Sequence, residues 1–400
     1  MSKQIQDAYI VAATRLPVAK RKGMFGHVRP DDMLAHAIRS VMAQAPGLDS
    51  ALVDDVIVGC AMPEAEQGMN VARIGVLLAG LPNNVPGMTI NRFCSSGLQA
   101  VADAAARIRL GEADVMIAAG TETMSLMNQI MGNKIAINPA FFEREENYAI
   151  AFGMGLTAEK VAQQWKVSRD DQDAFAVASH QKACAAIKAG HFKAEISPFT
   201  VKTHVPDLAS GAVTLREFVA DTDEGPRPDS SLERLAKLKP VFAARGSVTA
   251  GNSSQMSDGA GAVLIVSEKI LKQFNLKPLA RFAGYSVAGV PPEIMGIGPI
   301  EAIPRVMKRA GIGLQDVGWI ELNEAFAAQA LAVVRTLELD PAKVNPLGGA
   351  IALGHPLGAT GAVRTATIVH GLQRTRQRYG LVSMCIGTGM GAAGLFESIL

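Results

Sequence analysis

Cys94 is the residue of this chain whose surroundings point most directly to chemistry. It lies in NRFCSSGLQA, where two serines and a glycine follow it and open a predicted helix. A cysteine at a helix N-terminus gains from the partial positive charge there, which favours the thiolate over the thiol. A lone cysteine is more often a small buried hydrophobic residue, so its surroundings must decide its role.

His355 lies in a second segment of this kind, NPLGGAIALGHPLGATGA, whose many glycines let the backbone approach a ligand or another loop closely. If the chain contains the same unit twice, Cys94 and His355 occupy matching loops before a helix, and a two-fold-like packing brings them together. An imidazole beside a thiol can accept its proton and activate the sulfur as a nucleophile. The pair therefore predicts cysteine-based covalent catalysis.

Two further segments supply polar groups. Cys385 begins CIGTGMGAA, in which Gly387, Gly389 and Ala392 match a loose dinucleotide pattern. Too few residues follow for the helix and strand of that binding unit, so a strand, a tight turn and a returning strand are expected, with free N–H groups for an oxyanion. Asn323 in ELNEAF ends a strand, as either a helix N-cap or a positioned amide.

The order of the expected elements repeats along the chain. DAYIVAATRLPV and PDDMLAHAIRSVMAQ read as a strand and a helix, and LARFAGYSVAG and GPIEAIPRVMKRAG have the same order. Such alternation predicts an α/β fold with mostly parallel sheets covered by helices. Residues from about 125 to 250 fit neither copy and are interpreted as an inserted lid-like domain. Its helix DDQDAFAVASHQKACAAIKAG is expected to be capped by Asp170 or Asp171 and ended by Gly190.

Composition narrows the class of protein. The 400 residues predict two or three packed units, and a formal net charge of +2 is too balanced to indicate a nucleic-acid or membrane-surface protein. No apolar run approaches the ~20 residues of a membrane span, and the first residues lack the pattern of a signal peptide. The four cysteines form no C-x-x-C pair, so neither a zinc site nor a disulfide framework is expected.

Taken together, NRFCSSGLQA, LNEAFAAQ, GGAIALGHPLGATGA and CIGTGMGAA resemble the four signature blocks of the thiolase family, in the same order and spacing. EIMGIGPIEAIP and MGLTAEKVAQ are closest to the degradative 3-ketoacyl-CoA thiolases (acetyl-CoA C-acyltransferases). The resemblance implies duplicated βαβαβαββ units in a five-layered αβαβα sandwich. It places the N-terminal core unit at 1–124 and 247–275, an inserted CoA-binding loop domain at 125–246, and the C-terminal core unit at 276–400.

The resemblance also implies residue roles. Cys94 would attack the 3-keto carbon of a 3-ketoacyl-CoA and take the shortened acyl group as a thioester, while His355 would activate Cys94. Cys385 would protonate the departing acetyl-CoA carbanion and then deprotonate the incoming CoA. A water held by Asn323, together with His355, would stabilise the enolate oxygen. The N–H groups of Cys94 and Gly387 would hold the tetrahedral oxyanion.

Partners follow from the same resemblance. Arg227 in EGPRPDSSLERLAKLKPVF would lie near the adenine and phosphate groups of CoA, and Ser254 in TAGNSS near the pantetheine. CoA is a substrate, so no cofactor and no metal are expected. A homodimer or homotetramer is expected, with or without membership of a β-oxidation complex. His36, His180 and His191 are interpreted as ordinary surface or core residues.

Other functions stay open at this point. One is a biosynthetic or short-chain acetoacetyl-CoA thiolase, and another is a non-catalytic acyl-CoA or lipid-binding relative. A decarboxylating ketoacyl synthase would use one cysteine and two histidines, and Cys385 argues against it. SLMNQIMGNKIAINPAFFEREENYAIAFGMG should shape the acyl pocket without predicting a chain length. ESIL is not a peroxisomal Ser-Lys-Leu signal, so a cytoplasmic location is expected.

Overall fold

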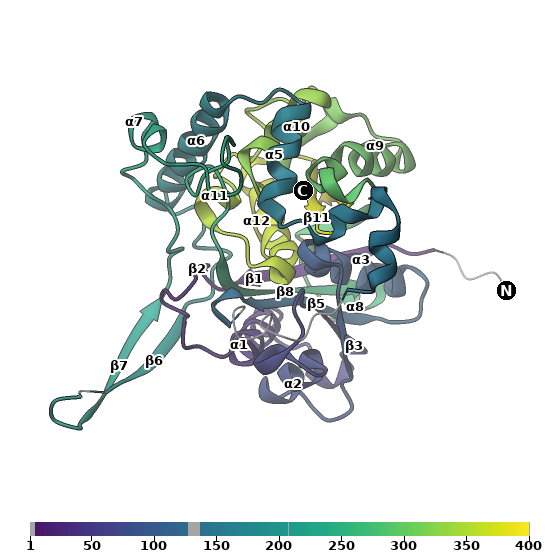
Figure 1. Cartoon of the computed structure of the whole chain (residues 1–400). Coiled ribbons are helices and arrows are strands. Elements are labelled where there is room, and N and C mark those ends of the chain that lie inside the picture. Colours follow the sequence, from purple (N-terminus) through teal and green to yellow (C-terminus); the bar gives the residue numbers. More distant parts are fainter. Residues whose placement is uncertain (1–4, 127–136, 207, 400) are drawn as a thin grey trace.

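Two sets of strands, joined edge to edge, form the centre of the protein (Figure 1). The computed structural model describes residues 5–126, 137–206 and 208–399. The strands are β1 (Ala8–Arg15), β2 (Ala19–Lys20), β3 (Asp55–Gly59), β4 (Gly87–Ile90), β5 (Val115–Thr123), β6 (Phe199–Pro206), β7 (Val213–Ala220), β8 (Ser257–Ser267), β9 (Ala280–Gly289), β10 (Val317–Leu322), β11 (Tyr379–Ile386) and β12 (Met390–Ser398).

Helices fill the segments between these strands. The α-helices are α1 (Pro30–Ala43), α2 (Val71–Leu78), α3 (Ser96–Arg109), α5 (Met154–Gln164), α6 (Arg169–Lys188), α7 (Leu232–Ala236), α8 (Glu268–Gln273), α9 (Gly298–Ala310), α10 (Ala327–Thr336), α11 (Ala350–Leu353) and α12 (Thr360–Thr375). The short 3-10 helices that bear on the site are η3 (Phe93–Ser95), η7 (Pro292–Ile297) and η9 (Leu357–Ala359). In the described part of the chain, no helix combines the length and apolar character needed to cross a membrane.

The strand order shows the duplication. The large sheet runs β10-β11-β12-β9-β1-β8-β5-β3-β4, with β2 beside β8. In the first half β3 pairs with β5 in parallel and β5 pairs with β8 antiparallel, and β10, β11 and β12 repeat that arrangement in the second half. The halves meet where β1 and β9 pair at Tyr9–Arg281 and Ile10–Ala280. The α/β class and the repeated unit predicted from the sequence are therefore confirmed. The expectation of mostly parallel sheets is wrong: among the described strands of the large sheet, six pairs are antiparallel and three are parallel, because the neighbours of β1, β8, β9 and β12 all run in the opposite direction to them.

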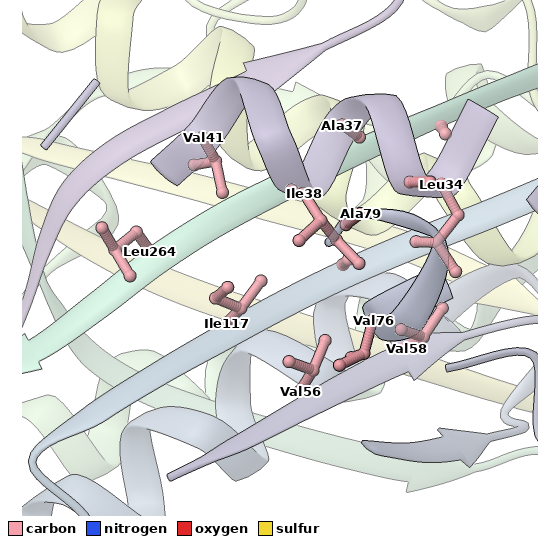
Figure 2. Close-up of a cluster of buried hydrophobic side chains, with 14 of the residues drawn as sticks. Leu34, Ala37, Ile38, Val41, Val56, Val58, Val76, Ala79, Ile117 and Leu264 are labelled. Atoms are coloured by element: carbon pink, nitrogen blue, oxygen red, sulfur yellow. The ribbon is translucent and has the colours of Figure 1, made fainter. Parts of the chain in front are cut away.

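Helices and half-sheets alternate in five layers. Figure 2 shows α1 turning Leu34, Ile38 and Val41 toward the first half-sheet, where Val56 and Leu264 are among the facing residues. On its other face that half-sheet packs against α3 and α12, which share one core with residues of the second half-sheet. Helices α9 and α10 cover the outer face of the second half-sheet.

The starts of α3 and α12 touch each other through their backbones. A Cβ atom at Gly361 would lie 1.9 Å from the Leu98 nitrogen, and one at Gly97 would lie 2.7 Å from the Ala362 nitrogen. Only glycine leaves room for so close an approach. This contact brings the segment that carries Cys94 against the segment that carries His355.

The segment expected to be inserted in the first core unit, residues 125–246, contains α5, α6, α7 and the β6–β7 hairpin, which projects away from the body (Figure 1). The cap expected for α6 at Asp170 or Asp171 is wrong. Ser168 caps the helix, because its hydroxyl accepts the Asp171 N–H while the Asp171 carboxylate accepts the Ser168 N–H. Gly190 follows the end of this helix, as expected. The domain boundaries themselves stay predictions, and residues 127–136 of the segment expected to shape the acyl pocket lie outside the described residues.

Candidate active site

Cys94 lies in η3, the single turn that leads into α3. Phe93 before it has a φ of 44°, a conformation that costs energy for a residue with a side chain. Ser96 stabilises this turn, because its hydroxyl accepts the Arg92 N–H at 2.8 Å and donates to the Phe93 carbonyl at 2.7 Å. The strained turn is thereby fixed at the position expected to hold a nucleophile.

Burial decides the protonation state of the Cys94 thiol. Desolvation raises its pKa to about 11, while the backbone N–H groups of Gly387 and of Cys94 itself face the sulfur and oppose this rise. Cys94 is therefore a thiol at neutral pH in the free protein, and a base must remove its proton before it can attack. The same two N–H groups were expected to form an oxyanion hole, and the structure places both at the sulfur.

His355 is a buried, neutral imidazole with a partner on each ring nitrogen. Its Nδ1 lies 2.7 Å from the Thr360 hydroxyl and its Nε2 lies 3.4 Å from the Asn323 amide nitrogen. Burial, followed by the charge of Arg364, lowers its pKa to about 3. With the proton on Nδ1 and donated to Thr360, Nε2 keeps its lone pair and can accept a proton. His355 is thus arranged as a base.

Asn323 follows β10 and faces the imidazole. Its N–H donates to the Ser383 carbonyl at 2.9 Å, which ties the end of β10 to β11. Its side-chain Oδ1 is buried and has no hydrogen-bond partner among the described atoms. A buried amide oxygen of this kind is available to a water or to a polar group of a ligand. Of the two roles left open by the sequence, the positioned amide is the one observed, since α10 begins only at Ala327.

Cys385 is the second-last residue of β11 and lies in apolar surroundings that include Met295, Ala325 and Phe326. Burial raises the pKa of its thiol, and a negative charge on Cys94 raises it further, which places the two sulfurs near each other. The following turn reverses the chain into β12, as expected. At Gly389, with φ 90°, a Cβ atom would lie 2.3 Å from the Val290 carbonyl oxygen, so the turn requires glycine there.

The structure brings five of the seven expected site residues together: Cys94, His355, Cys385, Asn323 and Gly387. The turn that holds Cys94 packs against β11 and against η9, which directly follows the His355 segment. Among the described residues, no group of three or more His, Cys, Asp or Glu side chains could hold a metal ion. The arrangement supplies a thiol, a base, a second thiol and N–H donors.

The remaining two expected residues lie in different surroundings. Arg227 lines a cavity of about 570 Å³, together with Asp229, Arg234 and Ser253. Its side chain is 69% exposed and its Nε lies 3.7 Å from the Asp229 carboxylate, so the guanidinium is accessible to an anion but already has one acidic neighbour. Ser254 does not line this cavity; its N–H donates to the Ala325 carbonyl at 2.9 Å.

His180, which the sequence analysis interpreted as an ordinary surface or core residue, also lines this cavity. Its Nδ1 accepts the Arg227 backbone N–H at 3.1 Å, although the two residues are 47 positions apart. Burial, followed by the Arg227 charge, lowers its pKa to about 4, so the imidazole stays neutral and remains an acceptor. Nothing in the local pattern around His180 signals this contact, because its partner lies on a distant loop.

A duplicated α/β fold with a cysteine, a histidine and a second cysteine at the meeting point of its halves defines an enzyme of the covalent, cysteine-nucleophile class. Comparison with known proteins identifies the family within this class. Residues 8–269 match the N-terminal domain of thiolase and residues 276–398 match its C-terminal domain. The chain belongs to the thiolase family.

Individual relatives agree with this assignment. The 3-ketoacyl-CoA thiolase of Bacillus subtilis (strain 168) is 50% identical over 395 residues, covering 98% of this chain and 100% of that protein. The acetyl-CoA acetyltransferase of Bacillus anthracis superimposes with a TM-score of 0.89 at 38% identity, covering 100% of both chains. The dimeric peroxisomal thiolase of Saccharomyces cerevisiae superimposes with a TM-score of 0.88 at 40% identity, covering 100% of this chain and 99% of that one.

Proposed function

We propose that this protein cleaves a 3-ketoacyl-CoA with CoA, releasing acetyl-CoA and a shortened acyl-CoA through an acyl-enzyme on Cys94. The observation that carries the proposal is the meeting of Cys94, Cys385 and His355 at the junction of the two halves of a thiolase-family chain. The 50% identity to a protein named 3-ketoacyl-CoA thiolase supports the choice of substrate.

The first half-reaction breaks a carbon–carbon bond. The Cys94 proton passes to His355 Nε2 while the sulfur bonds to C3 of the substrate, and the N–H groups of Cys94 and Gly387 stabilise the resulting oxyanion. The C2–C3 bond then breaks, and its electron pair becomes the enolate of acetyl-CoA. The Cys385 thiol donates its proton to C2. Acetyl-CoA leaves, and the protein holds a Cys94 thioester, a Cys385 thiolate and a His355 imidazolium.

The second half-reaction restores the starting state. The Cys385 thiolate takes the proton of the incoming CoA thiol, and the CoA sulfur attacks the thioester carbonyl. The bond from the carbonyl carbon to the Cys94 sulfur breaks, and Cys94 recovers its proton from His355. A thioester intermediate conserves the reactivity of the acyl group, so the exchange needs neither cofactor nor metal.

The substrate assay tests this proposal directly. Absorbance of the Mg-complexed enolate of the 3-ketoacyl-CoA should fall when CoA is added, both for acetoacetyl-CoA and for longer chains. Turnover of the longer chains supports the degradative function. Turnover confined to acetoacetyl-CoA supports the short-chain alternative, which the likeness to an acetyl-CoA acetyltransferase favours. Absence of turnover at every chain length, in folded protein, would contradict both and favour an acyl-CoA-binding role.

Arg227 is proposed to bind the phosphate end of CoA from the wall of the 570 Å³ cavity. Arg227→Ala should raise the KM for CoA about 10-fold with little change in kcat, because a guanidinium contact of about 1.4 kcal/mol would be lost far from the reacting atoms. Initial rates at varied CoA concentration measure the effect. Arg305→Ala removes a 49% exposed arginine on α9 that does not line the cavity, and it serves as the control. An unchanged KM would remove Arg227 from the CoA site.

Assembly, location and pathway are also proposed here. Strand β4 has a neighbour on one side only among the described strands and carries the 42% exposed Met88, so its free edge suits a homodimer contact. The yeast relative is described as dimeric. Light scattering distinguishes monomer, dimer and tetramer. A cytoplasmic location and a role in fatty-acid β-oxidation complete the proposal, and fractionation of the source cells tests the former.

A further inference from the structure

Glu122, near the end of β5, is a buried carboxylate that the mechanism above does not use. It is 1% exposed. Its oxygens accept the backbone N–H groups of Ala61 at 2.7 Å, Met62 at 3.2 Å and Gly358 at 2.9 Å, and also the side-chain amide of Gln67. These donors come from two separate parts of the chain: the loop after β3 and the loop that carries His355.

The charge of Glu122 is stabilised by dipoles alone. None of the ion pairs formed by the described residues includes it. Burial raises its pKa, and the hydrogen bonds from the three backbone N–H groups and Gln67 oppose this rise. Because every neighbour of the two oxygens is a donor, the site is built for a carboxylate.

The strand register gives Glu122 a defined place in the duplicated fold. It lies opposite Gly259 of β8, while Cys385 lies opposite Gly391 of β12. Those two glycines are equivalent in the repeated strands DGAGAVL and MGAAGLF. Glu122 therefore occupies in the first unit the position that Cys385 occupies in the second.

The same register pairs a second residue in each unit. Cys60 directly follows β3, and Asn323 directly follows β10, at equivalent positions. The Cys60 sulfur lies 3.9 Å from a Glu122 oxygen. The first unit thus presents Cys60 and Glu122 where the second unit presents Asn323 and Cys385. At these two positions the second unit supplies groups of the proposed reaction, whereas in the first unit Glu122 binds the loop of the other unit through Gly358.

The hydrogen bond from Gly358 connects Glu122 to the loop that holds His355, the proposed base. Gly358 lies between His355 and Thr360, the hydroxyl partner of the imidazole. A Cβ atom at Gly358 would lie 2.6 Å from the Ala61 nitrogen and 2.8 Å from a Glu122 oxygen, so the two loops are in backbone contact there. The Glu122 charge also acts on Cys94, where it adds to the larger effect of burial in favouring the thiol.

We propose that Glu122 is a positioning residue of the active site: its buried carboxylate fixes the His355 loop against the loop after β3 and contributes a negative charge to the surroundings of Cys94. This inference rests on the proposed thiolysis for its effect on turnover. Its effect on Cys94 can be measured without any substrate.

Two variants of Glu122 distinguish the effect of its charge from the effect of its side-chain length. Glu122→Gln keeps the length and removes the charge, whereas Glu122→Asp keeps the charge and shortens the side chain. Misplacement of the His355 loop should lower kcat of Glu122→Gln about 100-fold and lower that of Glu122→Asp as well. The pH midpoint of Cys94 alkylation by iodoacetamide, followed by mass spectrometry of its peptide, should fall in Glu122→Gln and stay near wild type in Glu122→Asp.

Asp54→Asn is the matched control. The Asp54 carboxylate also accepts two backbone N–H groups, of Asp114 and Val115, but at the opposite end of β5. Its kcat and its alkylation midpoint should equal those of wild type. Folded Glu122 variants with kcat within threefold of wild type, or an alkylation midpoint that does not fall in Glu122→Gln, would overturn the proposal. If Glu122→Gln does not fold, kcat of Glu122→Asp decides. A wild-type protein without thiolysis would refute the proposed function and leave the alkylation result valid.

Discussion

Cys94→Ala should lower the rate of thiolysis by at least about 10⁴-fold, the scale seen when an enzyme loses its nucleophile. The variant keeps the N–H groups of Cys94 and Gly387 and the His355 base, but the acyl group has no sulfur to receive it. Alanine is smaller than cysteine and suits the start of α3, so the fold should persist. The enolate assay with a long-chain 3-ketoacyl-CoA measures the loss.

Trapping of the intermediate completes this experiment. With substrate and no CoA, wild-type protein should gain the mass of the acyl group on the peptide that contains Cys94, and Cys94→Ala should gain none. Cys184→Ala is the control, because Cys184 is a half-buried thiol on α6 outside the site. Substantial turnover by Cys94→Ala, or an acyl group found on Cys385 in wild type, would assign the nucleophile elsewhere.

His355→Asn should lower kcat about 10²- to 10⁴-fold, the usual contribution of a positioned general base. The Asn side chain can keep a polar contact with Thr360, which now lies 2.7 Å from Nδ1, but it has no atom at the position of Nε2. The Cys94 thiol, whose pKa burial raises to about 11, then has no group to take its proton near neutral pH. A plot of kcat against pH should show activity recovering only in alkali. A kcat equal to wild type at pH 7 would contradict the assignment.

The same variant should change how stability depends on pH. Burial lowers the pKa of His355 to about 3, below the value of about 6.5 for an unfolded histidine. Between these values the unfolded chain binds the proton and the folded chain does not, so the free energy of unfolding rises with pH, by about 1.4 kcal/mol per unit. This contribution is complete above pH 6.5 and is lost as the pH falls toward 3.

Urea unfolding at pH 5 and pH 7.5 measures this effect. Wild type should lose about 2 kcal/mol more than His355→Asn between the two conditions. Burial raises the pKa of Glu321 to about 7, which acts in the opposite direction in wild type and variant alike, so it cancels in the comparison. Equal losses in the two proteins would mean that His355 is not held neutral by the fold.

Several features of the fold and site could be predicted from local sequence. The hydrophobic periodicity and the repeated order of segments predicted an α/β fold built twice, and the strand order shows that duplication. The glycines after Cys385 predicted the turn between β11 and β12, because only glycine tolerates the positive φ found at Gly389. Cys94 and His355 were paired because both precede a helix in matching loops. Each of these features rests on neighbouring residues or on the comparison of one segment with its copy.

Only the tertiary structure determined which polar groups far apart in the sequence meet. The acceptor role of Glu122, the contact of His180 with Arg227 and the contact of Asn323 with His355 each join residues that are 32 or more positions apart. The residues next to a carboxylate or an imidazole do not indicate which distant group will donate a hydrogen bond to it. Even among adjacent residues the choice can be ambiguous, since Ser168 caps α6 where Asp170 or Asp171 was expected. Sequence therefore predicted the repeated units, which the strand order confirms, and the candidate reactive residues, because both predictions rest on local periodicity and composition. Folding determined their protonation and partners, because both depend on burial between the two halves.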